Sequence, residues 1–131
     1  MLTAEDIKGV WAIGCTPSTE DASRWDATDT VDLDELARST NQIVEDGADG
    51  YITLGTTAEC ATLTRKEWED AVDCVLSTVN KRIPTLIGTT AMGTHEIVER
   101  MRFIRDKGAD GAILGLPTVP FWACRCGNPA P

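Results

Sequence analysis

The chain has 131 residues, 42% of them hydrophobic, which is the size and composition of one packed domain. Its formal net charge of −9 argues against nucleic acid as a partner, because phosphate binding needs clustered Lys and Arg side chains. It also argues against an anionic membrane surface, and no apolar run approaches the ~18 residues of a membrane span. Residues 1–6 are polar and acidic where a signal peptide would be basic, so we expect a cytoplasmic protein.

Residues 8–14 form a short apolar run that ends at a glycine, which is typical of a buried strand. The polar stretch that follows, residues 16–30, is predicted to be a long loop. Asp32 lies three positions before Glu35, a variant of the helix capping box, and apolar residues then recur at helical spacing as far as Gly47. A strand, a loop and a helix are therefore expected in this order.

The alternation continues in the middle of the chain. Residues 51–54 and 84–88 are predicted to be the second and third strands, because both are short, apolar and followed by glycine or end on it. Between them, Thr64 and Glu67 form a strict capping box at the start of a helix. The apolar stripe of this helix consists of Trp68, Ala71, Val72, Val75 and Val79.

A third helix and a fourth strand complete the pattern. Thr94 is predicted to cap the helix and Gly108 to close it. Its apolar stripe consists of Ile97, Met101 and Ile104. Residues 112–115 are predicted to form the last strand.

The predicted fold class is α/β. The order is β-α-β-α-β-α-β, and each strand is apolar along its length, so both faces should be buried, as in a parallel sheet with crossover helices. Gly-Ala-Asp-Gly at 47–50 recurs at 108–111, and Gly-Thr-Thr at 55–57 recurs at 88–90. Such repetition favours a (β/α)₈ TIM barrel. The alternative is a flavodoxin-like sheet, but no specific feature of the sequence supports it. Four strands make about half of a barrel, so residues 1–117 are predicted to be its first half.

The active site of a (β/α)₈ barrel lies at the C-terminal ends of the strands. Gly55, Thr56 and Thr57 occupy such a position after the second strand. The glycine lets a ligand approach the backbone, the threonines offer hydroxyls, and adjacent N–H groups can bind a carboxylate. The alternative is that these are loop residues that merely cap the next helix.

The segment 55–64, Gly-Thr-Thr-Ala-Glu-Cys-Ala-Thr-Leu-Thr, resembles the Gly-Thr-Thr-Gly-Glu segment of the dihydrodipicolinate synthase/N-acetylneuraminate lyase family. The motifs on either side of this segment follow one another in the same order as in that family, over roughly residues 8–117. Within the family, the acidic loop with Trp25 and the segment 59–64 resemble the trans-o-hydroxybenzylidenepyruvate hydratase-aldolases. The resemblance implies a cofactor-free and metal-free Schiff-base lyase whose substrate is a small 2-oxo acid.

By the same resemblance, Thr57, with Gly55, would hold the pyruvate carboxylate and Thr56 would belong to a proton relay. The activity implied is water addition and retro-aldol cleavage of an aromatic benzylidenepyruvate to an aromatic aldehyde and pyruvate. The alternatives are an inactive half-barrel or another pyruvate-dependent lyase such as dihydrodipicolinate synthase. The family's Schiff-base lysine comes from the sixth strand, and Lys8, Lys66, Lys81 and Lys107 do not replace it.

Several expectations concern the remaining residues. Residues 118–131 contain no acid and several prolines, so they are predicted to lie outside the fold, as in a frameshifted or prematurely ended reading frame. His95 is expected to be a solvated helix residue, and Trp25 to face the active site or to pin the long loop. Buried, reduced cysteines are expected at three positions: Cys15, Cys60 and Cys74.

A half-barrel leaves its two edge strands open. It also leaves exposed the row of side chains that would face the barrel axis, which we expect at Val10, Ile52 and Leu86 or their neighbours. Losing half of the apolar partners removes much of the free energy that offsets chain entropy. The isolated chain is therefore predicted to be poorly folded or self-associated, with a homo-oligomer as the favourable outcome.

Overall fold

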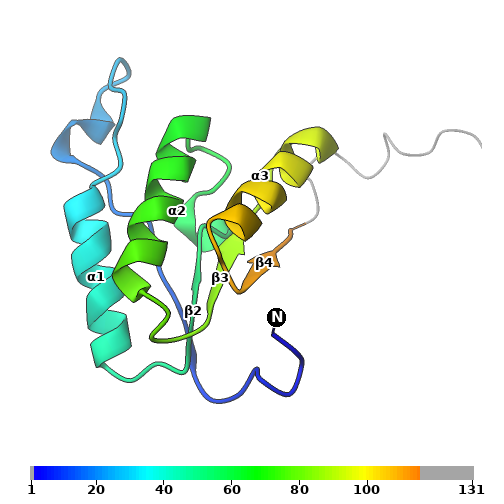
Figure 1. Cartoon of the computed structure of the whole chain (residues 1–131). Helices are drawn as coiled ribbons and strands as arrows, with labels where there is room; N and C mark the ends of the chain where they lie inside the picture. Colours follow the sequence, from blue (N-terminus) through cyan, green and yellow to red (C-terminus); the bar gives the residue numbers. More distant parts are fainter. Residues whose placement is uncertain (1, 116–131) are drawn as a thin grey trace, which may run out of the picture.

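The structure, a computed structural model, describes residues 2–115. It consists of parallel (β/α) units: each of the first three strands is followed by an α-helix, and the fourth strand is the last element of the described part of the chain (Figure 1). The strands are β1 (Trp11–Ile13), β2 (Gly50–Thr53), β3 (Thr85–Gly88) and β4 (Gly111–Ile113). The helices are α1 (Leu33–Glu45), α2 (Arg65–Val79) and α3 (Thr94–Asp106), with single 3-10 turns η1 (Glu20–Ser23) and η2 (Thr56–Ala58). The expected order of strands and helices is confirmed.

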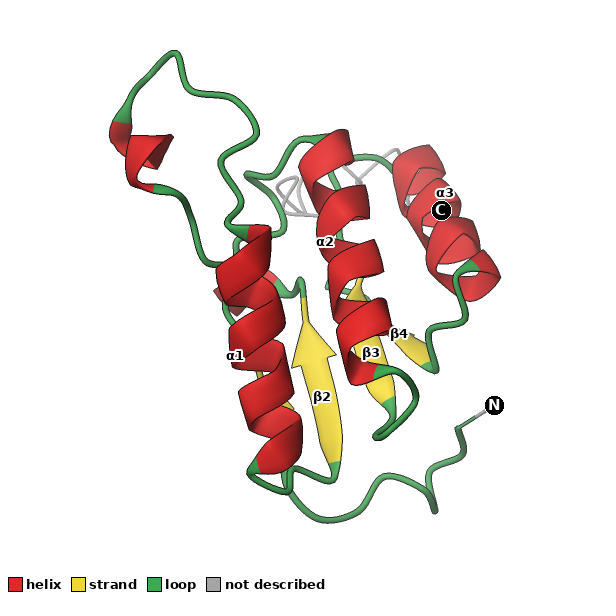
Figure 2. Ribbon diagram, turned by 60° about the vertical axis from the view of Figure 1, so that its left-hand side comes forward, coloured by secondary structure: helices red, strands yellow, loops and turns green. Residues whose placement is uncertain are grey.

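The four strands form one parallel sheet in the order β1-β2-β3-β4. All three helices lie on the same face of this sheet (Figure 2). Sequential parallel strands with crossover helices on one side are the arrangement of the first half of a (β/α)₈ barrel. The predicted end of the half-barrel at residue 117 and the segment 118–131 lie outside the described residues.

The Gly-Ala-Asp-Gly repeat performs the same task twice. The glycine that opens each copy has a φ of 85° and ends the preceding helix. The Asp49 carboxylate accepts the Val10 N–H at 2.7 Å, and the Asp49 N–H donates to the Val10 carbonyl at 2.9 Å. Asp110 makes the corresponding two bonds with Thr85, at 3.0 and 3.2 Å. Each aspartate therefore fastens the start of one strand to the start of the strand before it.

The core lies between the helices and the sheet. Every residue of the α2 stripe that runs from Trp68 to Val79 is buried, as predicted. The Trp68 indole N–H donates to the Gly88 carbonyl at 3.0 Å, and the ring packs against Phe103. Full burial of one such aromatic side chain contributes roughly 1.5–3 kcal/mol, so α2 supplies much of the stability of this layer.

The capping predictions have mixed outcomes. Thr64 and Glu67 form the full capping box of α2, as predicted. The Asp32 side chain accepts the Glu35 N–H at 2.9 Å, but Glu35 binds Arg38 instead of reaching back, so α1 has only half of a box. The predicted cap at Thr94 is wrong: α3 begins one residue earlier, after Gly93, which has no side chain to offer.

One residue of the predicted α3 stripe is also wrong. Ile97 and Ile104 are buried, but Met101 is 42% exposed and Arg100 takes its place in the interior, at 4% exposure. The Arg100 guanidinium lies over the Trp68 ring at 4.9 Å and donates to the Thr90 carbonyl at 3.1 Å. It also pairs with the Glu96 carboxylate of the same helix at 2.7 Å. The carboxylate, the aromatic face and the carbonyl together satisfy the buried charge, which hydrophobic periodicity alone does not anticipate.

The face of the sheet opposite the helices is only partly covered within the described residues, so burial of both faces is incomplete, as expected for a half-barrel: Ile52 and Leu86 are half-buried and Ile13 is exposed. Ile13, Ile52 and Leu86 are neighbours in the strand register and therefore share that face. Ile13 is 59% exposed. It takes the place that we expected for Val10, which precedes β1 and is 70% exposed.

The remaining side chains are placed as follows. Cys60 is buried and Cys74 half-buried, but Cys15, just past the edge strand β1, is exposed, so its predicted burial is wrong. His95 is exposed in the first turn of α3, as expected. No helix within residues 2–115 is long and apolar enough to cross a membrane.

Candidate active site

Gly55, Thr56 and Thr57 lie where β2 ends, at the rim formed by the C-terminal ends of the strands. The Gly14 N–H, just after β1, donates to the Ile52 carbonyl at 2.9 Å. The Thr89 N–H, just after β3, donates to the Ile113 carbonyl of β4 at 3.0 Å. Because the strands are parallel, these bonds place the segments that follow them on one rim, as we expected for Gly14, Thr57 and Thr89. Leu116, which we expect on the same rim, lies outside the described residues.

The two Gly-Thr-Thr segments of the rim differ in what their hydroxyls do. Thr89 is fully buried and its hydroxyl donates to the Ile113 carbonyl, while the Thr90 hydroxyl accepts the Gly115 N–H at 2.8 Å. Thr56 and Thr57 are exposed, and neither hydroxyl has a hydrogen-bond partner within residues 2–115. The second segment therefore fastens β3 to β4, whereas the hydroxyls of the first remain available to a ligand.

The two glycines differ in the same way. A Cβ on Gly88 would lie 1.7 Å from the Leu54 carbonyl oxygen, so packing requires glycine there. A Cβ on Gly55 would meet no atom within 4 Å, and its φ of −85° suits any residue. Neither crowding nor backbone conformation within the described residues requires glycine at 55, which fits a position that a ligand approaches closely.

Left-handed backbone brackets the turn that carries the two threonines. Leu54 has a φ of 54° and Glu59 a φ of 55°, and both are residues with a Cβ. Such conformations cost of order 1–3 kcal/mol each and are concentrated at functional sites. Between them, η2 presents the N–H groups of its first residues, which have no partner inside a helical turn. Holding Thr56 and Thr57 in this geometry therefore costs free energy, in the form of local backbone strain at Leu54 and Glu59.

The long loop after β1 is fastened to the same rim by Glu67, a role that the sequence did not indicate. One carboxylate oxygen of Glu67 accepts from the Thr30 N–H and hydroxyl at 2.7 and 3.0 Å. The other accepts from the Thr64 N–H and hydroxyl at 2.9 and 2.8 Å. Burial acts to raise the pKa of Glu67, but these hydrogen bonds outweigh it and lower the pKa to about 2.

Trp25 belongs to this loop, which stands out from the body of the protein (Figure 1). Its side chain is 97% exposed. Within the described residues it does not pin the loop, so that expectation is wrong, and the alternative that Trp25 faces the active site stays a prediction. The loop is held instead at its base, where the Thr16 hydroxyl donates to the Ala58 carbonyl at 2.9 Å and Ser18 pairs with Val31.

None of the lysines of the chain lies at the C-terminal end of a strand, as the sequence predicts. Lys8 precedes β1, at the opposite rim. Lys66 binds Asp70 and Asp29, and these bonds raise its pKa above the ordinary range. The other two are also paired with acids: Lys81 with Asp110 at 3.2 Å and Lys107 with Asp73 at 2.6 Å.

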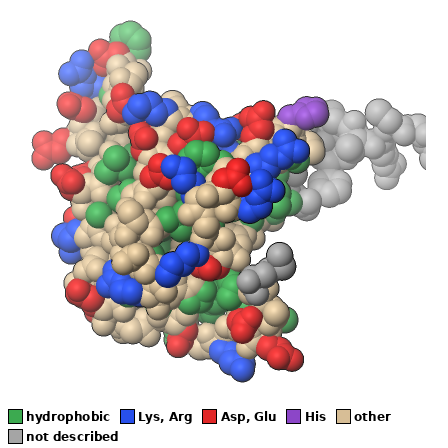
Figure 3. Space-filling view, viewed as in Figure 1, with side chains coloured by type: hydrophobic (Ala, Val, Ile, Leu, Met, Phe, Trp, Pro, Cys, Tyr) green, Lys and Arg blue, Asp and Glu red, His purple; other side chains and the backbone are tan. Residues whose placement is uncertain are grey.

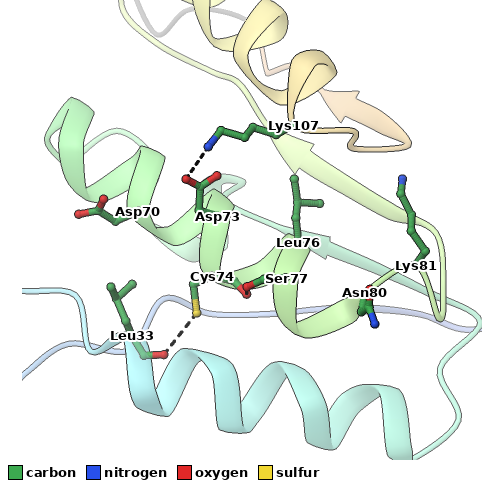
Figure 4. Close-up of a pocket in the computed structure, with 9 residues that line it drawn as sticks. All are labelled: Leu33, Asp70, Asp73, Cys74, Leu76, Ser77, Asn80, Lys81 and Lys107. Atoms are coloured by element: carbon green, nitrogen blue, oxygen red, sulfur yellow. Dashed lines mark hydrogen bonds and ion pairs between the residues drawn. The ribbon is translucent and has the colours of Figure 1, made fainter.

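A separate hollow of about 720 Å³ lies along the outer side of α2 (Figure 4). Its charged groups are all paired: Asp73 pairs with Lys107 across the hollow, and Asp70 and Lys81 pair with residues outside it. The Cys74 thiol donates to the Leu33 carbonyl at 3.4 Å. Burial raises the pKa of Cys74, so the thiol is a poor nucleophile. This open surface lies away from the strand ends, and its charged side chains are engaged in ion pairs. Among residues 2–115 no three His, Cys, Asp or Glu side chains are grouped to hold a metal ion.

Comparisons with known proteins agree with this geometry. The profile of the Dihydrodipicolinate synthetase family matches residues 19–123. The trans-o-hydroxybenzylidenepyruvate hydratase-aldolase of Pseudomonas putida is 49% identical over 121 residues, which are 92% of this chain and 36% of that protein.

Solved structures show the same likeness. The structure titled "PhdJ bound to substrate intermediate" has a TM-score of 0.85 and 40% identity, covering 88% of this chain and 36% of the other. The dihydrodipicolinate synthase of Acinetobacter baumannii complexed with pyruvate has a TM-score of 0.75 and 32% identity, covering 85% and 36%. The chain thus spans about a third of the length of these proteins.

Proposed function

This chain belongs to the dihydrodipicolinate synthetase family, and on that premise we propose that it supplies the first four strands and three helices of the barrel of a Schiff-base pyruvate lyase. The substrate class is a small 2-oxo acid with an aromatic group. The reaction is that of the hydratase-aldolases: water adds to the side-chain double bond, and cleavage gives an aromatic aldehyde and pyruvate. The identity of 49% to a hydratase-aldolase, against 32% to a dihydrodipicolinate synthase, favours this substrate class over the other.

One observation carries the proposal. Of two Gly-Thr-Thr segments on the same rim, one uses its hydroxyls for structure and the other leaves both unpaired beside an open glycine. In the proposed site, the Thr57 hydroxyl and the adjacent N–H groups bind the carboxylate of the 2-oxo acid. Thr56 holds a proton relay, and Gly55 admits the ligand to the backbone. The amine that forms the Schiff base comes from beyond the four described strands.

A chimera tests the proposal. It joins residues 1–117 of this chain to the remainder of the Pseudomonas putida relative, which supplies the other barrel strands. We expect pyruvate and borohydride to trap a covalent adduct on this chimera, and we expect it to cleave trans-o-hydroxybenzylidenepyruvate. A folded chimera that does neither would refute the proposal.

The Thr57→Val variant of the chimera tests the site itself. A hydrogen bond to a charged carboxylate contributes ~1.5–3 kcal/mol, so its loss should raise the KM for pyruvate-bearing substrates roughly 10- to 100-fold. The matched control is Thr90→Val in the other Gly-Thr-Thr segment, which removes the acceptor of the Gly115 N–H. The control should lower the melting temperature and leave KM unchanged. If both variants behave alike, Thr57 does not bind the carboxylate.

A further inference from the structure

Arg100 differs from the other arginines of α3 in being buried. Basic side chains gather on the surface over this helix in the space-filling view (Figure 3), and Arg102 and Arg105 are exposed. Arg100 is only 4% exposed. A guanidinium keeps its charge at any ordinary pH, so its burial costs free energy unless the charge is paired. The groups that Arg100 binds therefore indicate what its burial achieves.

Arg100 and Trp68 both bind the backbone of the second Gly-Thr-Thr segment. One guanidinium nitrogen of Arg100 donates to the Thr90 carbonyl at 3.1 Å, and the Trp68 indole N–H donates to the Gly88 carbonyl at 3.0 Å. The guanidinium lies over the indole ring, 4.9 Å from its centroid. Two bonds of 2.7 and 3.1 Å to the Glu96 carboxylate fix its orientation. Two stacked side chains, one from α2 and one from α3, thus hold two carbonyls of one segment.

The same segment supports the turn that carries Thr56 and Thr57. A Cβ on Gly88 would lie 1.7 Å from the Leu54 carbonyl oxygen and 2.7 Å from the Gly55 nitrogen. The Gly88 backbone therefore packs directly on the peptide that joins Leu54 to Gly55. Leu54 lies beyond the last residue of β2 and has a φ of 54°. Contact with Gly88 thus helps to fix the direction in which the chain leaves the sheet toward Thr56.

We propose that Arg100 is a positioning residue for the carboxylate site at residues 55–57, a role that presupposes the function proposed above for that site. The guanidinium acts through the backbone and not on the ligand: it holds the second Gly-Thr-Thr segment in the place against which the first is seated. The two identical segments then have complementary roles, one as the ligand site and the other as its support. The Thr90 hydroxyl acts on the side of β4, so the Thr90→Val control leaves this support in place.

Arg100→Met in the chimera tests this role. Methionine retains an apolar contact with the Trp68 ring and removes the donor to the Thr90 carbonyl. An apolar side chain in place of a buried ion pair is often nearly neutral for stability, so we expect the variant to fold. The KM for pyruvate-bearing substrates should rise about tenfold, as when one hydrogen bond to the carboxylate is misaligned, and kcat should stay within about twofold.

Three further variants separate positioning from general stability. Arg102→Met removes the same charge from an exposed place on the same helix and should change neither constant. Val75→Ala opens a cavity in the core, about two turns of α2 from Trp68, and should lower the melting temperature without raising KM. Trp68→Phe keeps an aromatic ring but removes the donor to the Gly88 carbonyl, so it should raise KM as Arg100→Met does.

Hydrogen exchange gives a measurement that needs no catalysis. The Ala58 and Cys60 N–H groups donate to the Gly55 carbonyl at 3.1 and 3.3 Å, so their exchange reports the turn. It should be about tenfold faster in Arg100→Met than in Arg102→Met, because a turn without its support opens more often. Faster exchange in a chimera without activity would support the positioning role and refute the proposed function.

Other outcomes would overturn the positioning role. Unchanged exchange of these two amides in Arg100→Met would do so, whether or not the chimera is active. So would a KM that Arg100→Met leaves unchanged, or one that Val75→Ala raises equally, since loss of stability alone would then explain the effect. If Arg100→Met does not fold, Trp68→Phe decides by the same two measurements.

Discussion

Replacing Glu67 by Gln should release the long loop from the rim while leaving the size of the side chain unchanged. The carboxylate accepts four hydrogen bonds, two from Thr30 and two from Thr64. Glutamine has one acceptor oxygen, so its amino group must face one of the two backbone N–H groups. Each bond to a charged acceptor contributes ~1.5–3 kcal/mol, and the buried N–H that remains unpaired adds its own cost. We expect a loss of about 2–4 kcal/mol in the free energy of unfolding.

The pH dependence gives a second measure of the same interaction. The pKa of Glu67 is about 2 in the folded chain, against about 4.3 for an unperturbed glutamate. A depressed pKa means that the carboxylate stabilises the fold fully above about pH 5, and that this contribution is lost as the pH falls toward 2. Somewhat over two pKa units correspond to roughly 3 kcal/mol, which lies within the loss of about 2–4 kcal/mol expected for Glu67→Gln.

Urea unfolding followed by circular dichroism, at one fixed chain concentration, measures the difference between Glu67→Gln and the unchanged chain at pH 7 and pH 3. Hydrogen exchange at the Thr30 amide reports the loop directly. The control is Glu99→Gln, since Glu99 is exposed and makes one 3.4 Å contact, so its change should stay within about 0.5 kcal/mol. A gap that is absent at pH 7, or equally large at pH 3, would refute the assignment of Glu67 as the anchor.

Two further predictions concern the lysines and the glycines of the chain. Pyruvate and borohydride should leave no adduct on the 131-residue chain, because none of its lysines lies at the C-terminal end of a strand; mass spectrometry that finds a trapped lysine would contradict this. Gly88→Ala should destabilise the fold by roughly 3 kcal/mol, since the new Cβ meets the Leu54 carbonyl, whereas Gly55→Ala should raise stability by about 0.4–1 kcal/mol. Thermal unfolding of the two variants decides between this view and one in which both glycines are needed for packing.

The sequence predicts the strands and helices well because their signals are local. The stripe from Trp68 to Val79 and the box of Thr64 and Glu67 act within one helix, and both are confirmed. The errors arise where a distant partner decides. Arg100 pairs locally with Glu96, but its burial also depends on Trp68 and the Thr90 carbonyl, and helical periodicity contains neither of these two contacts.

The candidate site was located on the rim by the fold and by resemblance, and its chemistry stays a prediction. The sequence could not show that the two Gly-Thr-Thr segments have different roles, because their residues are identical. The distinction depends on the Ile113 carbonyl, the Gly115 N–H and the Leu54 carbonyl, all of them backbone atoms of other strands and loops. The second role of Glu67 was missed for the same reason, because Thr30 is 37 positions away.

The two aspartates of the Gly-Ala-Asp-Gly repeat divide the sheet into two fastened pairs, β1 with β2 through Asp49 and β3 with β4 through Asp110. Between β2 and β3, the corresponding backbone bond runs from the Tyr51 N–H to the Pro84 carbonyl, with no side-chain bond of this kind in the described part of the chain. Recombination between family members therefore has a natural crossover in residues 54–84, which keeps each aspartate with the strand it fastens. A crossover in residues 11–48 would take Asp49 and the start of β1 from different parents. A crossover in residues 86–109 would do the same for Asp110 and the start of β3.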